Sequence, residues 1–238
     1  KISSASKPDI VTDYPPFIEG TDISACQAWL GRNKKSMFLN LKTEEGVAIV
    51  KELVKEYDIV LEQFRPGVMD KLGIGYEDLK AVNPSVIYCS LTGYGQTGPL
   101  RDAAGHDINY MARSGIISHA GRKEEGPSLM NFQIADIAVG SLNSVIGILA
   151  AVNHRRNTGE GQFIDVAMMD GCVPFNSIES LADRLNDYIN NIQTKYFPGK
   201  KVILVPMSMG ASVTTAYLDA YPTRATSHVK RVIGIVGA

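Results

Sequence analysis

Apolar and polar positions alternate with two different periods along most of the chain. After Thr43 and two glutamates, apolar residues recur at helical spacing from Val47 to Val54. This pattern is typical of a helix that Thr43 caps, with acidic residues in its first turn, and that ends near Tyr57. Shorter apolar runs bounded by polar residues predict strands at Ser36–Leu41, Ile59–Glu62, Val86–Leu91 and Gln162–Met168.

Two further helices follow from the same kind of pattern. One covers Tyr76–Val82 and stops at Asn83-Pro84, because proline disfavours helical geometry in the residue before it. The other, Ala135–Asn153, is long and rich in small residues, and the basic His154-Arg155-Arg156 after it suits the negative end of its dipole. Strands that alternate with helices at this spacing predict βαβ units on a parallel sheet, which is an α/β fold.

The C-terminal part carries a strand–turn–helix–strand unit of its own. Apolar residues at helical spacing after Leu181 precede a predicted strand at Lys201–Val205. A helix from Gly210 to about Ala220 and a last strand at Val229–Val236 complete the unit. A second α/β pattern therefore begins near Leu181, and the family resemblances described below imply two parts, residues 1–178 and 179–238.

Composition and charge narrow the class of protein. The 238 residues are 45% apolar and include 24 basic against 25 acidic residues, for a formal net charge of −1. That balance argues against a nucleic-acid-binding protein, which would carry a basic excess or a basic block. The apolar stretches Val145–Val152 and Val202–Val213 are shorter than the roughly 20 residues that cross a bilayer. We expect neither a nucleic-acid partner nor a membrane span.

The cysteines and the two chain ends add expectations about the cellular context. Cys26, Cys89 and Cys172 lie far apart and lack the spacing of a metal site. We expect reduced thiols, no disulfide and no metal, in a cytoplasmic protein. The chain opens at Lys1 without an initiator methionine or an apolar signal core, and it ends at Ala238 directly after an apolar run. Both ends are expected to be cut.

A dense series of short motifs runs through residues 1–178. In chain order they are Arg32–Ser36, Glu62–Val68, Leu72–Tyr76, Asn83-Pro84, Tyr88–Ser90, Gly93–Pro99 and Gly159–Gln162. The series resembles the class III CoA-transferase family, which includes formyl-CoA transferase, carnitine CoA-transferase and α-methylacyl-CoA racemase. The resemblance implies an incomplete Rossmann-like domain, coenzyme A as part of a small-molecule acyl-CoA substrate, and a homodimer.

A CoA ligand carries phosphates, so its site needs cations and backbone N–H groups. Arg65, before Pro66-Gly67, suits a fixed guanidinium fork, with a structural ion pair as the alternative role. Arg32 and Lys35 are second candidate contacts, or else exposed surface cations. Gly95 lies in the glycine-rich turn, which either brings backbone donors close to a thioester or is an ordinary tight turn.

His106 and Asp136 carry the candidate chemistry that the resemblance implies. In the transferase branch, the aspartate matching Asp136 is the nucleophile that attacks the acyl-CoA thioester. In the racemase branch, a histidine and this aspartate lie on opposite faces of the α-carbon, and one removes the proton that the other returns. The transferases generally lack a histidine at the His106 position, so the resemblance favours proton transfer by His106 and Asp136. The alternatives are CoA transfer through Asp136, a structural His106 and a helix-capping Asp136.

The stretch Lys201–Gly210 resembles a different family, the α/β-hydrolases, in the strand-to-helix turn that carries their nucleophilic serine. Ser208 stands at the position of that serine, and Pro206 replaces the first glycine of the motif. Asp219 and His228 lie too close along the chain to match the triad order of that family. The resemblance implies a partial α/β-hydrolase unit in which Ser208 lacks its base.

Two partial domains of different families would thus adjoin near residue 178, with no Gly/Ser-rich linker between them. Natural fusions usually join complete domains through exposed linkers, so we expect a chimera of two gene fragments. The favoured function is that of an acyl-CoA enzyme with proton transfer like that of 2-methylacyl-CoA racemase. The alternatives are CoA transfer between an acyl-CoA and a carboxylic acid, a serine hydrolase fragment, and an inactive chimeric fragment.

Overall fold

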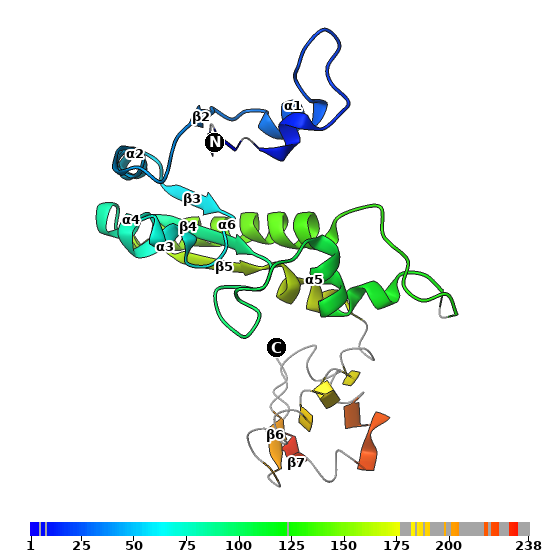
Figure 1. Ribbon diagram of the computed structural model, residues 1–238. Coiled ribbons are helices and arrows are strands. Elements are labelled where there is room, and N and C mark those ends of the chain that lie inside the picture. The colour runs from blue at the N-terminus through cyan, green and yellow to red at the C-terminus, as the bar shows by residue number, and fades with distance from the viewer. Residues whose placement is uncertain are drawn as a thin grey trace. The chain divides into compact units, whose positions relative to one another are not determined.

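The fold is described from a computed structural model (Figure 1). The structure describes residues 1–176 apart from 5, 8 and 123, together with 182–183, 185–187, 189–190, 198, 201–204, 217–218, 220–223 and 229–232. The chain divides into two compact units. Unit 1 consists of residues 1–102 and 142–166, and unit 2 of residues 103–141 and 167–238.

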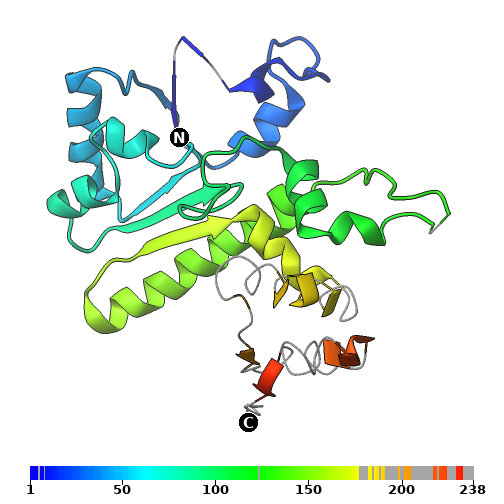
Figure 2. The ribbon, with the colours of Figure 1, turned by 60° about the horizontal axis from the view of Figure 1, so that its bottom comes forward.

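A three-stranded sheet forms the centre of unit 1. Its order is β3 (Ile59–Glu62), β4 (Ile87–Thr92) and β5 (Phe163–Ala167), and the strands lie side by side in both ribbon views (Figures 1 and 2). β3 and β4 run parallel, in a register that pairs Val60 with Tyr88. The predicted strand Ile59–Glu62 and its parallel pairing are confirmed. β4 and β5 overlap their predicted ranges closely.

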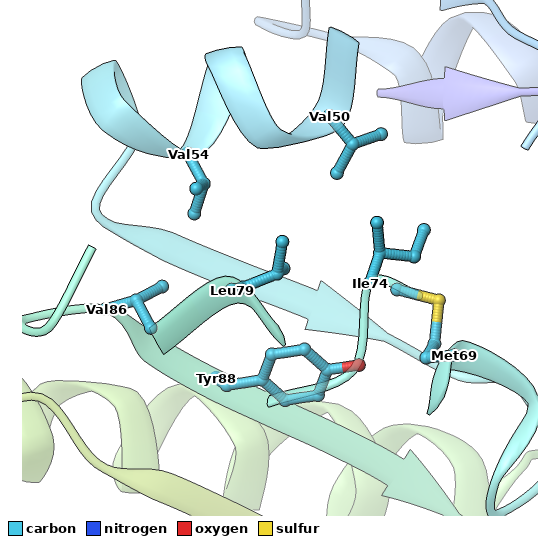
Figure 3. Close-up of a cluster of buried hydrophobic side chains, with 7 residues drawn as sticks. All are labelled: Val50, Val54, Met69, Ile74, Leu79, Val86 and Tyr88. Carbon is cyan, nitrogen blue, oxygen red and sulfur yellow. The ribbon is translucent and has the colours of Figure 1, made fainter. Parts of the chain in front are cut away.

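Three helices pack on one side of this sheet. α2 (Glu44–Glu56) begins after Thr43, whose Oγ1 accepts a hydrogen bond from the Gly46 N–H at 3.1 Å, as the capping pattern predicts. α3 (Val68–Lys71) and α4 (Tyr76–Val82) follow β3, and α4 has its predicted bounds. Burial of each apolar side chain between these helices and the sheet stabilises the folded state by about 1.5–3 kcal/mol. The cluster, drawn in Figure 3, consists of Val50, Val54, Met69, Ile74, Leu79, Val86 and Tyr88.

The other side of the sheet packs against α6 (Leu142–Thr158). Adjacent residues of β4 separate the two sides, because Tyr88 belongs to the apolar cluster whereas the Cys89 thiol is hydrogen-bonded to Ser144 of α6. In α6, a Cβ at Gly147 would lie 2.9 Å from Ile164 Cγ2 of β5, so the glycine permits this close packing. Helices on both sides explain why β4 is buried over almost its whole length.

The C-terminal end of α6 lies at Thr158, past the predicted end at Asn153. Arg155 explains the difference, because its Nη1 lies 3.0 Å from Asp58 Oδ1 and donates to the Ser85 carbonyl at 3.3 Å. The basic residues expected after the helix therefore form its last turn, where their charge complements the helix dipole.

The N-terminal part of unit 1 holds a separate, two-stranded sheet. β1 (Ile2–Ser3) pairs in parallel with β2 (Met37–Phe38), which confirms the strand expected within Ser36–Leu41. Between these strands lie a 3₁₀ turn (Ile10–Asp13) and α1 (Ala25–Gly31), neither of which the apolar pattern predicts.

Unit 2 brings three helical segments together. α5 (Asp107–Ser114), the π-helical segment η3 (Ile134–Ser141) and α7 (Met168–Cys172) contact one another pairwise. Short 3₁₀ turns follow, at Ile116–His119 and Val173–Phe175. The long helix expected from Ala135 therefore begins in π-helical geometry, which is frequent at functional sites.

The helical run Ile134–Thr158 is long and apolar enough to cross a membrane by length and composition. The sequence-based expectation of no membrane span considered the shorter stretch Val145–Val152, and it stays a prediction. Core helices of soluble proteins pass the same test, so one such helix is weak evidence for a membrane span.

In the C-terminal part, β6 (Val202–Leu204) and β7 (Val229–Val232) pair in parallel, inside the two strands predicted there. The helix expected between them is described only at Tyr217, Leu218 and Ala220, which are helical. Ser208 lies outside the described residues. The expected boundary at residue 178 stays a prediction, since the two compact units divide the chain elsewhere.

Candidate functional site

Unit 1 holds a pocket beside the carboxyl ends of β3 and β4, the edge where α/β sheets usually bind ligands. Its volume is about 190 Å³, and Arg65 is among its lining residues. Three lining side chains are aromatic, and the ring centroids of Tyr76, Tyr88 and Phe163 lie 5.3 to 6.0 Å apart. The pocket thus combines an aromatic wall and one guanidinium group with the carboxyl groups of Glu62, Asp70 and Glu77.

The loop after β3 presents Arg65 to this pocket. β3 ends at Glu62, and Arg65-Pro66-Gly67 leads directly into α3. Gly67 has a φ of +79°, a left-handed conformation that residues with a Cβ rarely adopt. The Arg65 side chain is exposed, so its guanidinium can meet an anionic ligand from solvent. This placement is consistent with the predicted contact to CoA phosphates.

The Glu62 carboxylate links β3, β4 and the turn that follows β4. Its Oε1 accepts a hydrogen bond from Ser90 Oγ, and its Oε2 accepts one from the Phe64 N–H at 2.7 Å. Gln96 Nε2 in turn donates to Ser90 Oγ at 2.9 Å. Burial raises the pKa of Glu62, and the hydrogen bonds from Ser90 and Phe64 partly oppose that rise.

The glycine-rich turn after β4 satisfies its own backbone groups. The Gly95 N–H donates to Thr92 Oγ1 at 3.0 Å, and the Gln96 N–H donates to Asp165 Oδ2 at 2.9 Å. Because the Gly95 N–H has an internal acceptor, it is not available to a thioester in this conformation. The binding role of Gly95 stays a prediction that would require the turn to rearrange.

Arg32 and Lys35 are exposed and lie between α1 and β2. The guanidinium carbon of Arg32 lies 5.0 Å from the centre of the Trp29 ring, which is a cation–π distance. Neither residue lines the pocket that contains Arg65. Their contact with CoA phosphates stays a prediction.

His106 and Asp136 both lie in unit 2. His106 directly precedes α5, and its backbone N–H donates to Asn109 Oδ1 at 2.9 Å. This hydrogen bond fixes the backbone at the start of α5, while the His106 side chain remains exposed. Asp136 belongs to the first turn of η3 and is half-buried.

Three hydrogen bonds hold Asp136 in place. The Asp136 N–H donates to Asp107 Oδ1 at 2.9 Å. Gln133 Nε2 donates to Asp136 Oδ2 at 3.0 Å. Ser141 Oγ donates to the Asp136 carbonyl at 2.9 Å. Backbone and carboxylate are therefore both anchored, which favours a defined position for the carboxyl group.

The ionisation of Asp136 reflects its surroundings. Burial raises the pKa of Asp136, the negative charge of Asp107 raises it further, and His106 lowers it. These influences mean that His106, Asp107 and Asp136 form one electrostatic cluster. A carboxyl group with a raised pKa keeps its proton to higher pH than an exposed aspartic acid does.

Two hydrogen-bond partners of Asp136, Asp107 and Gln133, were not predicted as site residues. Asp107 reaches Asp136 across 29 positions of the chain, and no local pattern shows such a contact. Gln133 precedes Asp136 by three positions, which is the spacing of neighbouring side chains on a helix. This spacing is the one sequence feature that could have indicated their contact.

The three cysteines form no disulfide with one another. Cys26, Cys89 and Cys172 are unpaired. Burial raises the pKa of the Cys89 and Cys172 thiols, which favours the unreactive neutral form. Within the described part of the chain, no group of three or more His, Cys, Asp or Glu side chains is arranged to hold a metal.

Comparison with known protein families shows which family the chain belongs to. The sequence profile of CoA-transferase family III matches residues 1–201. The chain belongs to CoA-transferase family III. The family match extends beyond Leu181, where the hydrolase-like stretch was expected to begin, so the α/β-hydrolase resemblance is not supported. The α/β fold and the acyl-CoA substrate class expected from the motifs are those of the family.

Relatives of family III include both racemases and transferases. The chain is 45% identical over 148 residues to human alpha-methylacyl-CoA racemase and 42% identical over 160 residues to succinate–glutarate CoA-transferase of Agrobacterium fabrum. These alignments cover 62% and 66% of this chain, but 39% and 40% of the relatives. A crystal structure of a CaiB/BaiF family protein from Brucella suis superposes with a TM-score of 0.68 at 39% identity, over 79% of this chain and 49% of that one. The chain spans less than half the length of these relatives.

Proposed function

We propose that the chain acts on 2-methylacyl-CoA thioesters by transferring the α-proton, with His106 and Asp136 as the two acid–base groups. The observation that carries the proposal is the cluster in unit 2, where the Asp136 N–H donates to Asp107 Oδ1, the residue directly after His106, and where His106 lowers the pKa of Asp136. Arg65, exposed at a pocket in unit 1, supplies a cation for the phosphates of the CoA moiety.

The proposed reaction moves one proton and conserves all atoms. One group, in its deprotonated form, takes the proton from the α-carbon, and the C–H electron pair forms an enolate whose negative charge rests on the thioester oxygen. The other group, in its protonated form, delivers a proton to the opposite face of that carbon. The result is inversion at the α-carbon, and the two groups have exchanged protonation states.

The chemistry of the two side chains supports these roles. Histidine side chains titrate near neutral pH, so both forms are present under physiological conditions. The raised pKa of Asp136 increases the fraction of its carboxyl group that holds a proton, as a proton donor requires. Gln133 holds this carboxyl group and Asp107 holds its backbone, so the position of the carboxyl group is constrained.

CoA transfer through Asp136 is the second candidate, favoured by the 42% identity to the Agrobacterium transferase. In that reaction the Asp136 carboxylate attacks the thioester carbon and displaces the CoA thiolate, forming a mixed anhydride. The attack requires the ionised carboxylate, which a raised pKa makes less abundant. Proton transfer, in contrast, gives a role to His106, which directly precedes the Asp107 that accepts the Asp136 N–H.

Deuterium exchange at the α-carbon tests the proposal. We expect the chain, incubated in D₂O with 2-methylacyl-CoA, to replace the α-proton by deuterium, as followed by proton NMR. His106→Ala should slow this exchange by about 10²–10⁴-fold, the usual contribution of an acid–base group. His154→Ala is the matched control, since its half-buried histidine lies on α6 of unit 1.

Three outcomes would contradict the proposal. The wild-type chain could show no exchange, or His106→Ala could retain the wild-type rate. A chain that moves CoA from an acyl-CoA to a free carboxylic acid, without α-deuteration, would instead establish the transferase alternative.

A further inference from the structure

Asp107 makes a contact with Asp136 that the proposed proton transfer does not itself use. Asp107 begins α5, and its Oδ1 accepts a hydrogen bond from the Asp136 N–H at 2.9 Å. Asp136 lies in the first turn of η3, where backbone N–H groups have no acceptor within their own helix. A carboxylate from another segment therefore provides the cap that this turn needs.

We propose that Asp107 is a positioning residue for Asp136, holding its backbone through this hydrogen bond and placing a second negative charge beside its carboxyl group. The inference rests on the proposed function for its catalytic meaning, but the contact itself is independent of the reaction. Asp107 thus acts through Asp136 rather than on the substrate.

The charged and titratable groups around Asp136 come from two elements besides its own. His106 and Asp107, at the start of α5, respectively lower and raise its proton affinity. Cys172 lies on α7. Burial is the main cause that raises its pKa, and the negative charges of Asp107 and Asp136 raise it further. The Cys172 thiol is therefore uncharged. The charges that shift the pKa of Asp136 then come from Asp107 and His106.

Two substitutions separate the two actions of Asp107. Asp107→Asn keeps an oxygen that can accept the Asp136 N–H but removes the negative charge. Asp107→Ala removes both the acceptor and the charge, which leaves the Asp136 N–H without its partner. Asp102→Asn is a matched control, because Asp102 is an exposed carboxylate of unit 1.

The primary measurement is the NMR titration of the Asp136 carboxyl carbon, which needs no catalytic activity. We expect the pKa of Asp136 to fall in Asp107→Asn and to stay at its wild-type value in Asp102→Asn. Amide hydrogen exchange should be about tenfold faster at Asp136 in Asp107→Ala, the effect of one lost hydrogen bond, and close to wild type in Asp107→Asn.

The activity measurement then distinguishes this inference from the proposed function. We expect the pH profile of α-deuteration to move to lower pH in Asp107→Asn, which a purely structural role would not cause. An unchanged Asp136 pKa in Asp107→Asn, or an equal shift in Asp102→Asn, would overturn the inference. If the NMR results are as expected but His106→Ala retains α-deuteration, the positioning role stands and the proposed proton transfer fails.

Discussion

Two carboxyl groups, one in each unit, have pKa values raised by burial, yet their surroundings differ. Glu62 of unit 1 receives hydrogen bonds from Ser90 and the Phe64 N–H, both of which stabilise its charged form. Asp136 of unit 2 accepts a side-chain hydrogen bond from Gln133, and the charges of Asp107 and His106 act on its pKa in opposite directions. The comparison shows that burial raises the pKa of both carboxyl groups and that their neighbours distinguish them.

The neighbours decide what each group can do. The Glu62 carboxylate links β3 to β4 and, through Ser90, to the turn after β4. Its hydrogen bonds therefore hold residues that line the pocket containing Arg65. The pKa of Asp136 depends on burial and also on the neighbouring charges of Asp107 and His106. The proposed function gives the Arg65 pocket of unit 1 a role in binding and the Asp136 cluster of unit 2 a role in proton transfer, and four predictions test these roles.

The largest expected effect is on catalysis in unit 2. Asp136→Asn should lower the maximal rate of α-deuteration by about 10²–10⁴-fold, because an amide cannot exchange a proton with the substrate. The Michaelis constant for 2-methylacyl-CoA should change little. Steady-state deuteration kinetics measure both quantities, and a rate close to wild type would remove Asp136 from the reaction.

The next effect concerns stability, and it contrasts the two units. Leu79 is fully buried whereas Ile137 on η3 is 55% exposed. Leu79→Ala should lower the free energy of unfolding by about 2–5 kcal/mol, through lost burial and a cavity. Ile137→Ala should change it by no more than about 0.5 kcal/mol. Urea denaturation followed by circular dichroism provides the test, and equal losses would contradict the contrast.

A smaller effect is expected on substrate binding in unit 1. Arg65→Ala should weaken the affinity for free CoA by about 10–100-fold, the value of one charged hydrogen-bonding group, and should spare the maximal deuteration rate. Isothermal titration calorimetry gives the affinity. Arg122→Ala, which removes an exposed arginine of unit 2, is the matched control. Equal affinities of both variants would place the phosphates elsewhere.

The smallest effect is a pH-dependent gain in stability. Because folding raises the pKa of Asp136, the protonated form is favoured in the folded state, and its contribution is lost as pH rises through the folded pKa. Asp136→Asn mimics that neutral form. It should therefore unfold at a higher temperature than wild type near pH 8, whereas the two should converge at about pH 3, below the unfolded pKa. A constant difference across thermal melts at both pH values would contradict this reading.

The part of the fold that follows local rules was predictable from the sequence. Thr43 and the glutamates after it define the start of α2, and Asn83-Pro84 defines the end of α4. The end of α6 was missed, since Arg155 is held by Asp58 and the Ser85 carbonyl, which are distant in sequence. Hydrophobic periodicity reports local structure, so it does not reveal partners that are distant in sequence.

The candidate site was predictable only in part, and for the same reason. His106 and Asp136 were named through the family resemblance, and the structure brings them into one cluster. The contact of Asp107 with the Asp136 backbone and the internal hydrogen bond of Gly95 depend on side chains and turns that local patterns do not position. Backbone groups of a loop can satisfy one another, so a glycine-rich sequence alone does not show which N–H groups face a ligand.

The contact between Arg32 and Trp29 has a practical consequence for spectroscopy. Trp29 is the one tryptophan of the chain and is 69% exposed, with the Arg32 guanidinium beside its ring. Tryptophan fluorescence therefore reports on this α1 segment, without interference from other indoles. If Arg32 moves from the ring to a CoA phosphate, the emission changes on titration with CoA, and a variant lacking Arg32 loses that response. An unlabelled chain thus carries its own optical reporter beside a predicted phosphate contact.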